Sequence, residues 1–87
     1  MTYSSEFTPH FLRLLRKLDT RTKMRVLSSL EEILENPRAG SQLVYSEETE
    51  FKWRVGDYRI IYLIDERRKV VIFVVVDHRS IIYKRYH

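Results

Sequence analysis

The sequence predicts one small α+β domain spanning residues 1–87, with a helical hairpin packed on one face of a mainly antiparallel, twisted sheet. Apolar residues recur at helical spacing between residues 8 and 36, and at every second position from residue 51. A continuous apolar run, residues 70–76, is typical of a central strand covered on both faces. The predicted order is therefore β-α-α-β-β-β followed by a short C-terminal tail.

The first strand and the first helix are predicted from adjoining residues. Residues 2–7 form a plausible strand because Tyr3 and Phe7 lie at even spacing. Thr8 then suits the N-cap of a helix, and Pro9 suits its first position. The apolar stripe of this helix comprises Phe11, Leu14, Leu15 and Leu18.

A second helix follows the break at Asp19-Thr20, where Asp19 is the expected cap. It ends at Asn36-Pro37, because the residue before a proline avoids the α region. Residues 38–49 form a polar connection to the sheet. The stripe of the second helix comprises Val26, Leu27, Leu30, Ile33 and Leu34.

The strands predicted over residues 51–55 and 58–64 flank the turn signal Gly56-Asp57. A turn of two residues, or of four, sets Arg54 opposite Arg59 and places Lys52 on the same face. A loop of three residues would break that pairing. The opposite, core-facing side would comprise Phe51, Trp53, Val55, Tyr58, Ile60 and Tyr62.

Positive charge is concentrated in the sheet half of the chain. The sequence has 16 Lys+Arg and 12 Asp+Glu, for a net charge of +4. Two directly opposed arginines cost stability, which a bound polyanion would offset. The sequence therefore favours an anion-binding face, although a solvated outer face with splayed side chains is the alternative.

The end of the predicted central strand adds further polar groups. If this strand lies beside the hairpin, Arg79 and Tyr83 reach the edge of the basic face, with His78 close by. Such a set suits phosphodiester chemistry without a metal, because arginines stabilise charge developing on phosphorus and a lysine can act as general base. Residues 80–87 read as either a strand end or a terminal helical turn.

Several classes of protein are excluded or disfavoured. The absence of cysteine removes disulfides and thiolate chemistry. His10, His78 and His87 lack the spacing of metal ligands, so no metal or cofactor is expected. No apolar run approaches the roughly 20 residues of a membrane span, and no signal peptide is visible. A cytoplasmic protein without membrane contact is the expectation.

The run Val55-Gly56-Asp57-Tyr58-Arg59-Ile60-Ile61-Tyr62, with His78-Arg79 and then Tyr83, resembles the RelE/ParE superfamily of toxins from type II toxin–antitoxin systems. The resemblance covers nearly the whole chain and is closer to the RelE branch. That branch implies a metal-independent endoribonuclease that enters the ribosomal A site and cuts mRNA through its 2′-hydroxyl, inhibiting translation. The ParE branch implies a DNA gyrase inhibitor, and a catalytically silent antitoxin-binding member is a further alternative.

The resemblance also implies roles for individual residues. Lys52 would be the general base, Arg59 and Arg79 would bind the phosphate in the transition state, and Tyr83 would stack on a base. Arg54 would clamp a phosphate or donate a proton, where the best-known RelE pattern has lysine. His78 or His87 would share the acid–base work.

The resemblance implies macromolecular partners and no small-molecule cofactor. These are a cognate RelB-like antitoxin that covers the basic face, the ribosome and its mRNA. Basic residues of the predicted helices would contact ribosomal RNA, or else form a solvated helix face. They are Arg13, Arg16, Lys17, Arg21, Lys23 and Arg25.

Overall fold

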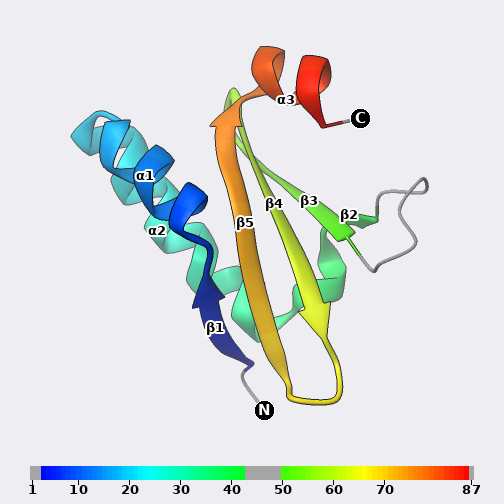
Figure 1. Cartoon of the computed structure of the whole chain (residues 1–87). Helices are drawn as coiled ribbons and strands as arrows, with labels where there is room; N and C mark the ends of the chain where they lie inside the picture. Colours follow the sequence, from blue (N-terminus) through cyan, green and yellow to red (C-terminus); the bar gives the residue numbers. More distant parts are fainter. Residues whose placement is uncertain (1–2, 43–49, 87) are drawn as a thin grey trace.

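The computed structural model describes residues 3–42 and 50–86 (Figure 1). Its elements are β1 (Ser4–Phe7), α1 (Pro9–Lys17), α2 (Thr20–Glu35), the 3₁₀ turn η1 (Pro37–Ala39), β2 (Ser41–Gln42), β3 (Glu50–Val55), β4 (Tyr58–Asp65), β5 (Val70–His78) and α3 (Arg79–Arg85). The predicted α+β class and element order are confirmed. The structure adds the short strand β2 and resolves the open alternative for the tail, which is helical.

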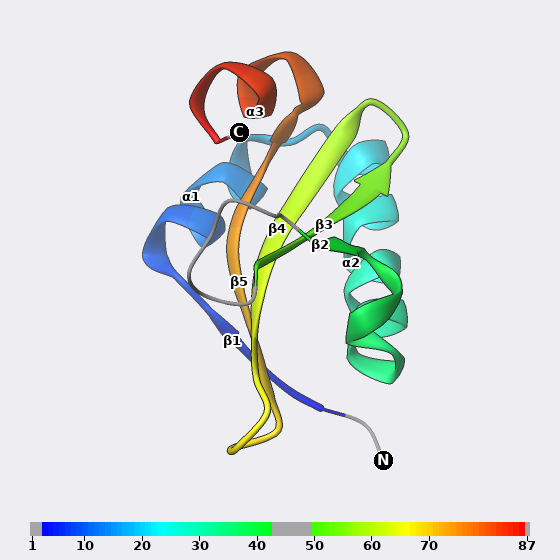
Figure 2. The same cartoon turned by 90° about the vertical axis from the view of Figure 1, so that its right-hand side faces the viewer.

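The strands form one sheet in the order β1-β5-β4-β3-β2. Strand β1 runs parallel to β5, whereas the other neighbours are antiparallel. The parallel contact arises because α1 and α2 carry the chain away before it returns (Figure 2). The sheet is therefore mainly antiparallel, as predicted, with β4 and β5 at its centre.

Both long helices begin where the sequence predicts. The Thr8 hydroxyl accepts a hydrogen bond from the Phe11 amide at 3.0 Å and donates one to the Val74 carbonyl at 2.9 Å. The Asp19 carboxylate accepts from the Thr22 amide at 3.2 Å. Each cap satisfies an amide that the helix itself leaves unpaired. The Thr8 cap also ties α1 directly to β5.

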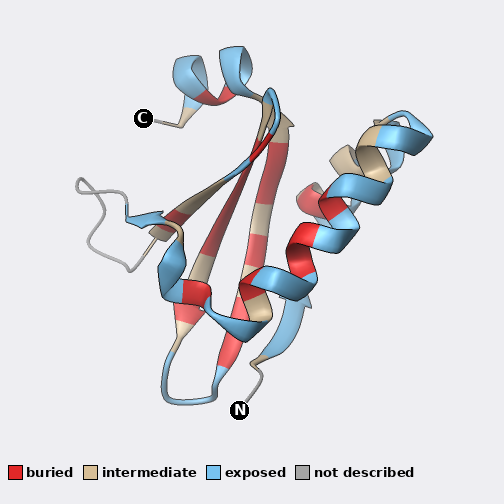
Figure 3. Ribbon diagram, turned by 180° about the vertical axis from the view of Figure 1, so that it is seen from behind, coloured by how far each residue is buried: buried red, intermediate tan, exposed pale blue. Residues whose placement is uncertain are grey.

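The main core lies between the long helices and one face of the sheet (Figure 3). Its buried members are Phe11, Val26, Leu30, Ile33, Phe51, Val55, Ile60, Tyr62, Ile64, Val71, Phe73 and Val76. A smaller cluster on the other face joins Ile61 and Val75 to Ile82 of α3. Strand β5 is thus covered on both faces, as its apolar run predicts.

A bulge in β5 sets which residues face α3. Ile61 pairs with Val75 and Tyr62 pairs with Phe73, so Val74 is an extra residue in the ladder. A bulge resets the alternation of side chains along a strand. Beyond it, Val75 and Asp77 lie on the same face as Ile61 and Arg59, which is the face that α3 partly covers.

Candidate functional site

The β3–β4 hairpin has the register that the sequence predicts. Val55 pairs with Tyr58, Arg54 with Arg59, and Lys52 with Ile61 across a two-residue turn. Gly56 adopts φ +58 in this turn, a conformation that residues with a Cβ rarely take. Lys52, Arg54 and Arg59 consequently share the face of the sheet opposite the main core.

Arg59 is the buried member of this group, with only 4% of its surface exposed. Its Nη1 donates to the Gly56 carbonyl and to the Tyr58 carbonyl, both at 2.8 Å. Its buried Nε has no hydrogen-bond partner in the described part of the chain. Asp77 is its register partner on β5. The turn thus holds the guanidinium in place while one of its donors stays unused.

Tyr83 comes to the same group from α3. A hydrogen bond from Arg59 lowers the pKa of the Tyr83 phenol, and the charges of Arg59, Lys52 and Arg54 lower it further. The Lys52 Nζ lies 5.4 Å from the centroid of the Tyr83 ring. Tyr83 remains 47% exposed, so an incoming aromatic group can reach its ring. The structure therefore brings together four of the predicted site residues, and their chemistry favours a bound anion.

Arg79 and His78 border this group but are held differently. The Arg79 amide donates to the Asp57 carbonyl at 2.7 Å, and its Nε lies 3.9 Å from the Asp57 Oδ1. The His78 Nδ1 caps α3 by accepting from the Ser80 amide at 3.2 Å. The His78 ring also contacts the Tyr58 ring edge-on at 5.5 Å, on the opposite face from Lys52. His87 lies outside the described residues.

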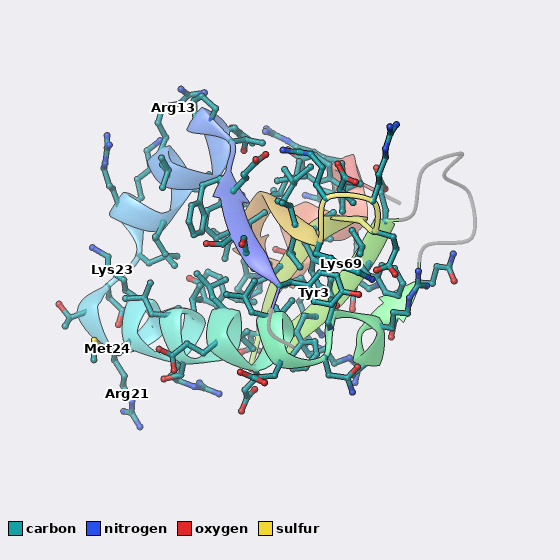
Figure 4. All side chains as sticks on the ribbon, turned by 90° about the horizontal axis from the view of Figure 1, so that it is seen from below. Tyr3, Arg13, Arg21, Lys23, Met24 and Lys69 are labelled. Carbon is teal, nitrogen blue, oxygen red and sulfur yellow. The ribbon has the colours of Figure 1, made fainter. Side chains whose placement is uncertain are left out.

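The basic residues of the helices do not join the group as a set. Arg13, Arg16 and Lys17 are exposed on α1, which packs against β5. Figure 4 shows Arg13, Arg21 and Lys23 pointing outward, away from the sheet.

Arg25 is the exception among the helical cations. A Cβ added to Gly56 would lie 3.0 Å from the Arg25 Nη1 and 3.1 Å from its Nη2. The guanidinium of Arg25 therefore rests against the β3–β4 turn. Sequence reasoning grouped this residue with the other helical cations, because nothing in its spacing distinguishes it from them.

The described residues contain no cluster of three or more His, Asp and Glu side chains that could hold a metal ion. A cavity of about 400 Å³ opens beside the outer edge of β3. It is lined by Glu32, Ala39, Gly40, Ser41, Lys52, Trp53 and Arg54. None of the described helices combines the length and the apolar character that crossing a bilayer requires.

The fold and the site define a class: a small α+β domain that presents a cationic, tyrosine-containing face on a β-hairpin. Residues 5–83 match the family model described as "ParE toxin of type II toxin-antitoxin system, parDE". The chain belongs to this family, and it is a toxin of the RelE/ParE type from a type II toxin–antitoxin system.

Individual relatives agree with this assignment. The protein named as toxin RelE4 in Methanocaldococcus jannaschii is 35% identical over 89 residues, covering 95% of this chain and 93% of the relative. Toxin RelG of Mycobacterium tuberculosis is 34% identical over 87 residues, covering 98% and 100%. The toxin–antitoxin complex RelBE2 of M. tuberculosis contains a chain with TM-score 0.81 and 32% identity, covering 91% of this chain and all of that one.

Proposed function

We propose that this toxin is an endoribonuclease that cuts mRNA in the ribosomal A site and thereby stops translation. The observation that carries the proposal is the convergence of Lys52, Arg54, Arg59 and Tyr83 on one face of the hairpin. Three cations around a partly exposed aromatic ring are suited to an RNA strand, because they pair with phosphates while the ring stacks on a base.

The proposed reaction is a transesterification at one phosphodiester. Lys52 takes the proton from the 2′-hydroxyl, whose oxygen attacks the adjacent phosphorus. A new P–O2′ bond forms and the P–O5′ bond breaks, which leaves a 2′,3′-cyclic phosphate on one product. The departing 5′-oxygen takes up a proton, which we assign to Arg54 as donor.

The other groups act on charge and orientation. Arg59 and Arg79 stabilise the negative charge that grows on the phosphorus oxygens, which is work that a metal ion performs in other nucleases. Tyr83 stacks on a base and so holds the scissile phosphate against the cations. No redox or group-transfer cofactor enters this reaction.

A protein antitoxin is the second proposed partner. The structurally similar M. tuberculosis chain was solved as a toxin–antitoxin complex. A RelB-like antitoxin with acidic and apolar residues would neutralise the basic face, competing with RNA for it. The ribosomal target implies that the free toxin acts in the cytoplasm.

Primer extension on programmed ribosomes tests the cleavage. We expect new 5′ ends within the A-site codon with the parent protein, and none on free mRNA. Arg59→Ala and Arg79→Ala should each lower the cleavage rate by about 10²–10³-fold, the usual cost of removing one transition-state donor. Arg68→Ala, which removes an arginine at the far end of the sheet, should cleave as the parent does. Intact mRNA on active ribosomes would overturn the proposal.

A second candidate is inhibition of DNA gyrase, which the ParE name of the matching family model favours. A supercoiling assay distinguishes it, because a gyrase inhibitor would block supercoiling and would tolerate replacement of Lys52. A catalytically silent, antitoxin-binding member would do neither, and its expression without an antitoxin would be harmless.

A further inference from the structure

Three arginines surround the Gly56-Asp57 turn, and one of them comes from the opposite side of the sheet. Arg59 holds the Gly56 carbonyl at 2.8 Å, and the Arg79 amide holds the Asp57 carbonyl at 2.7 Å. The guanidinium of Arg25, from α2, rests against Gly56. Cations from α2, β4 and α3 therefore meet at the rim of the molecule.

This arrangement has an excess of positive charge. Within residues 3–42 and 50–86, the only ion pair of these three arginines joins Arg79 to Asp57 at 3.9 Å, and the Asp57 side chain is 71% exposed. Arg54 stands directly across from Arg59 and adds to the excess. Like charges held this close are stabilised by an anion that lies among them.

We propose that Arg25 binds the RNA backbone, and that the RNA strand continues from the Lys52–Arg59 face over the Gly56-Asp57 turn to α2. The inference rests on the proposed function for its ligand, RNA, but it names a contact outside the catalytic face. Gly56 leaves room for this close approach, since a Cβ there would lie 3.0 Å from the Arg25 Nη1, tighter than an ordinary van der Waals contact. The continuity of the arginines with the basic face favours a phosphate chain over an acidic peptide.

The contact is tested by equilibrium binding rather than cleavage. A fluorescent single-stranded RNA hexanucleotide, methylated at every 2′-oxygen so that it cannot be cut, is titrated with protein over a series of salt concentrations. Each phosphate contact to a single strand contributes about 0.7 to the slope of log K against log salt. Arg25→Gln should reduce the steepness of the slope by about 0.7 and weaken binding severalfold at low salt.

A matched control lies one helical turn away on α2. Arg21→Gln removes the same charge from the same helix, but this side chain points outward (Figure 4). It should leave the slope unchanged. Arg25→Lys keeps the charge and should keep the slope, although a lysine cannot reproduce a flat guanidinium contact with the turn.

A trinucleotide separates direct contact from positioning. If Arg25 touches a phosphate beyond the catalytic face, Arg25→Gln weakens binding of the hexanucleotide but leaves binding of the trinucleotide unchanged. Equal losses for both lengths would show that Arg25 acts only by holding the turn and Arg59, and would overturn the proposal. The proposal would also be overturned if Arg21→Gln lost as much RNA affinity as Arg25→Gln, or if the parent protein bound no single-stranded RNA. A glutamate-rich peptide titrated in the same way would overturn it if Arg25→Gln weakened binding of the peptide but not of RNA.

These outcomes are independent of the cleavage assay. A parent protein that cleaves on the ribosome while Arg25→Gln retains the full salt slope would refute only this inference. A parent that binds RNA through Arg25 but never cleaves would refute only the proposed nuclease.

Discussion

Two lysine–tyrosine pairs lie at opposite ends of the sheet, and their surroundings differ in charge. Lys52 lies 5.4 Å from the Tyr83 ring near the β3–β4 turn, and Lys69 lies 5.4 Å from the Tyr3 ring near the β4–β5 loop. Arg59 lowers the pKa of Tyr83 by donating a hydrogen bond to it. Tyr3 donates to the Glu66 carboxylate at 2.6 Å, which raises its pKa.

The carboxylates around each pair account for this difference. At the β4–β5 end, Arg68 Nη1 lies 2.9 Å from Glu6 and its Nε lies 2.7 Å from Asp65. Glu66 lies 3.5 Å from Lys69 and 3.8 Å from Arg38. At the other end, the only ion pair that the described residues of the turn form joins Asp57 to Arg79 at 3.9 Å. At the β4–β5 end, the paired cations link neighbouring strands. Near the β3–β4 turn, the cations outnumber the carboxylates beside them and are available to an external anion.

Replacing one lysine at each end of the sheet by methionine should produce the largest difference in cleavage rate. Lys52→Met removes the proposed general base and should lower ribosomal cleavage by about 10²–10⁴-fold. Lys69→Met should leave cleavage within a few-fold of the parent, since its partners are structural. Single-turnover cleavage on programmed ribosomes measures both, with circular dichroism to verify the fold. Equal losses would remove the functional distinction between the two ends.

Substitutions at the β3–β4 turn and at the β4–β5 loop should change the free energy of unfolding in opposite directions. Gly56 has φ +58 and Lys69 has φ +56. Gly56→Ala should destabilise the fold by about 1–2 kcal/mol, because a Cβ is disfavoured in the left-handed region.

Lys69→Gly relieves the same strain at the other turn. It should stabilise the fold by less than about 1 kcal/mol, because greater freedom in the unfolded chain and the loss of the exposed Lys69–Glu66 ion pair offset part of the gain. Urea unfolding of both variants checks the prediction. Two changes of the same sign would contradict it.

The phenol titrations should separate the two tyrosines. Tyr83 should ionise below its ordinary pKa of 10.0 and Tyr3 above it, because one faces cations and the other a carboxylate. Lys52→Met should move the Tyr83 midpoint upward without affecting Tyr3. Ring-carbon NMR resolves the two phenols, and coincident midpoints would mean that the side chains do not face these partners in solution.

Acid should weaken the β4–β5 end of the sheet. Hydrogen bonds from Arg68 lower the pKa of Asp65, and one from Tyr3 lowers that of Glu66. Their contribution to stability is present above the unfolded values of 3.8 and 4.5 and is lost as pH falls through the lower folded values. Thermal unfolding followed downward from pH 6 should show a modest loss that Arg68→Ala reduces. An unchanged pH profile in that variant would show that Arg68 does not stabilise the Asp65 carboxylate.

The sequence was sufficient for the features that depend on local spacing. The two-residue turn at Gly56 determines the register of the hairpin, and the period of two then places Lys52, Arg54 and Arg59 on one face. Thr8 and Asp19 begin helices because their side chains bond amides three residues later. These rules act between neighbours in the chain, so they can be read without coordinates.

Other features depended on tertiary packing. The Val74 bulge resets β5, the helical tail brings Tyr83 to Arg59, and α2 sets Arg25 against Gly56. Each depends on residues that are far apart in the chain. The apolar periodicity does not determine them, because many placements of the helices satisfy the same pattern. The sequence alone therefore determined which strand face carries the cations. Only the tertiary structure decided which cations become buried, paired or exposed, because packing sets the distances between elements and charge interactions depend on those distances.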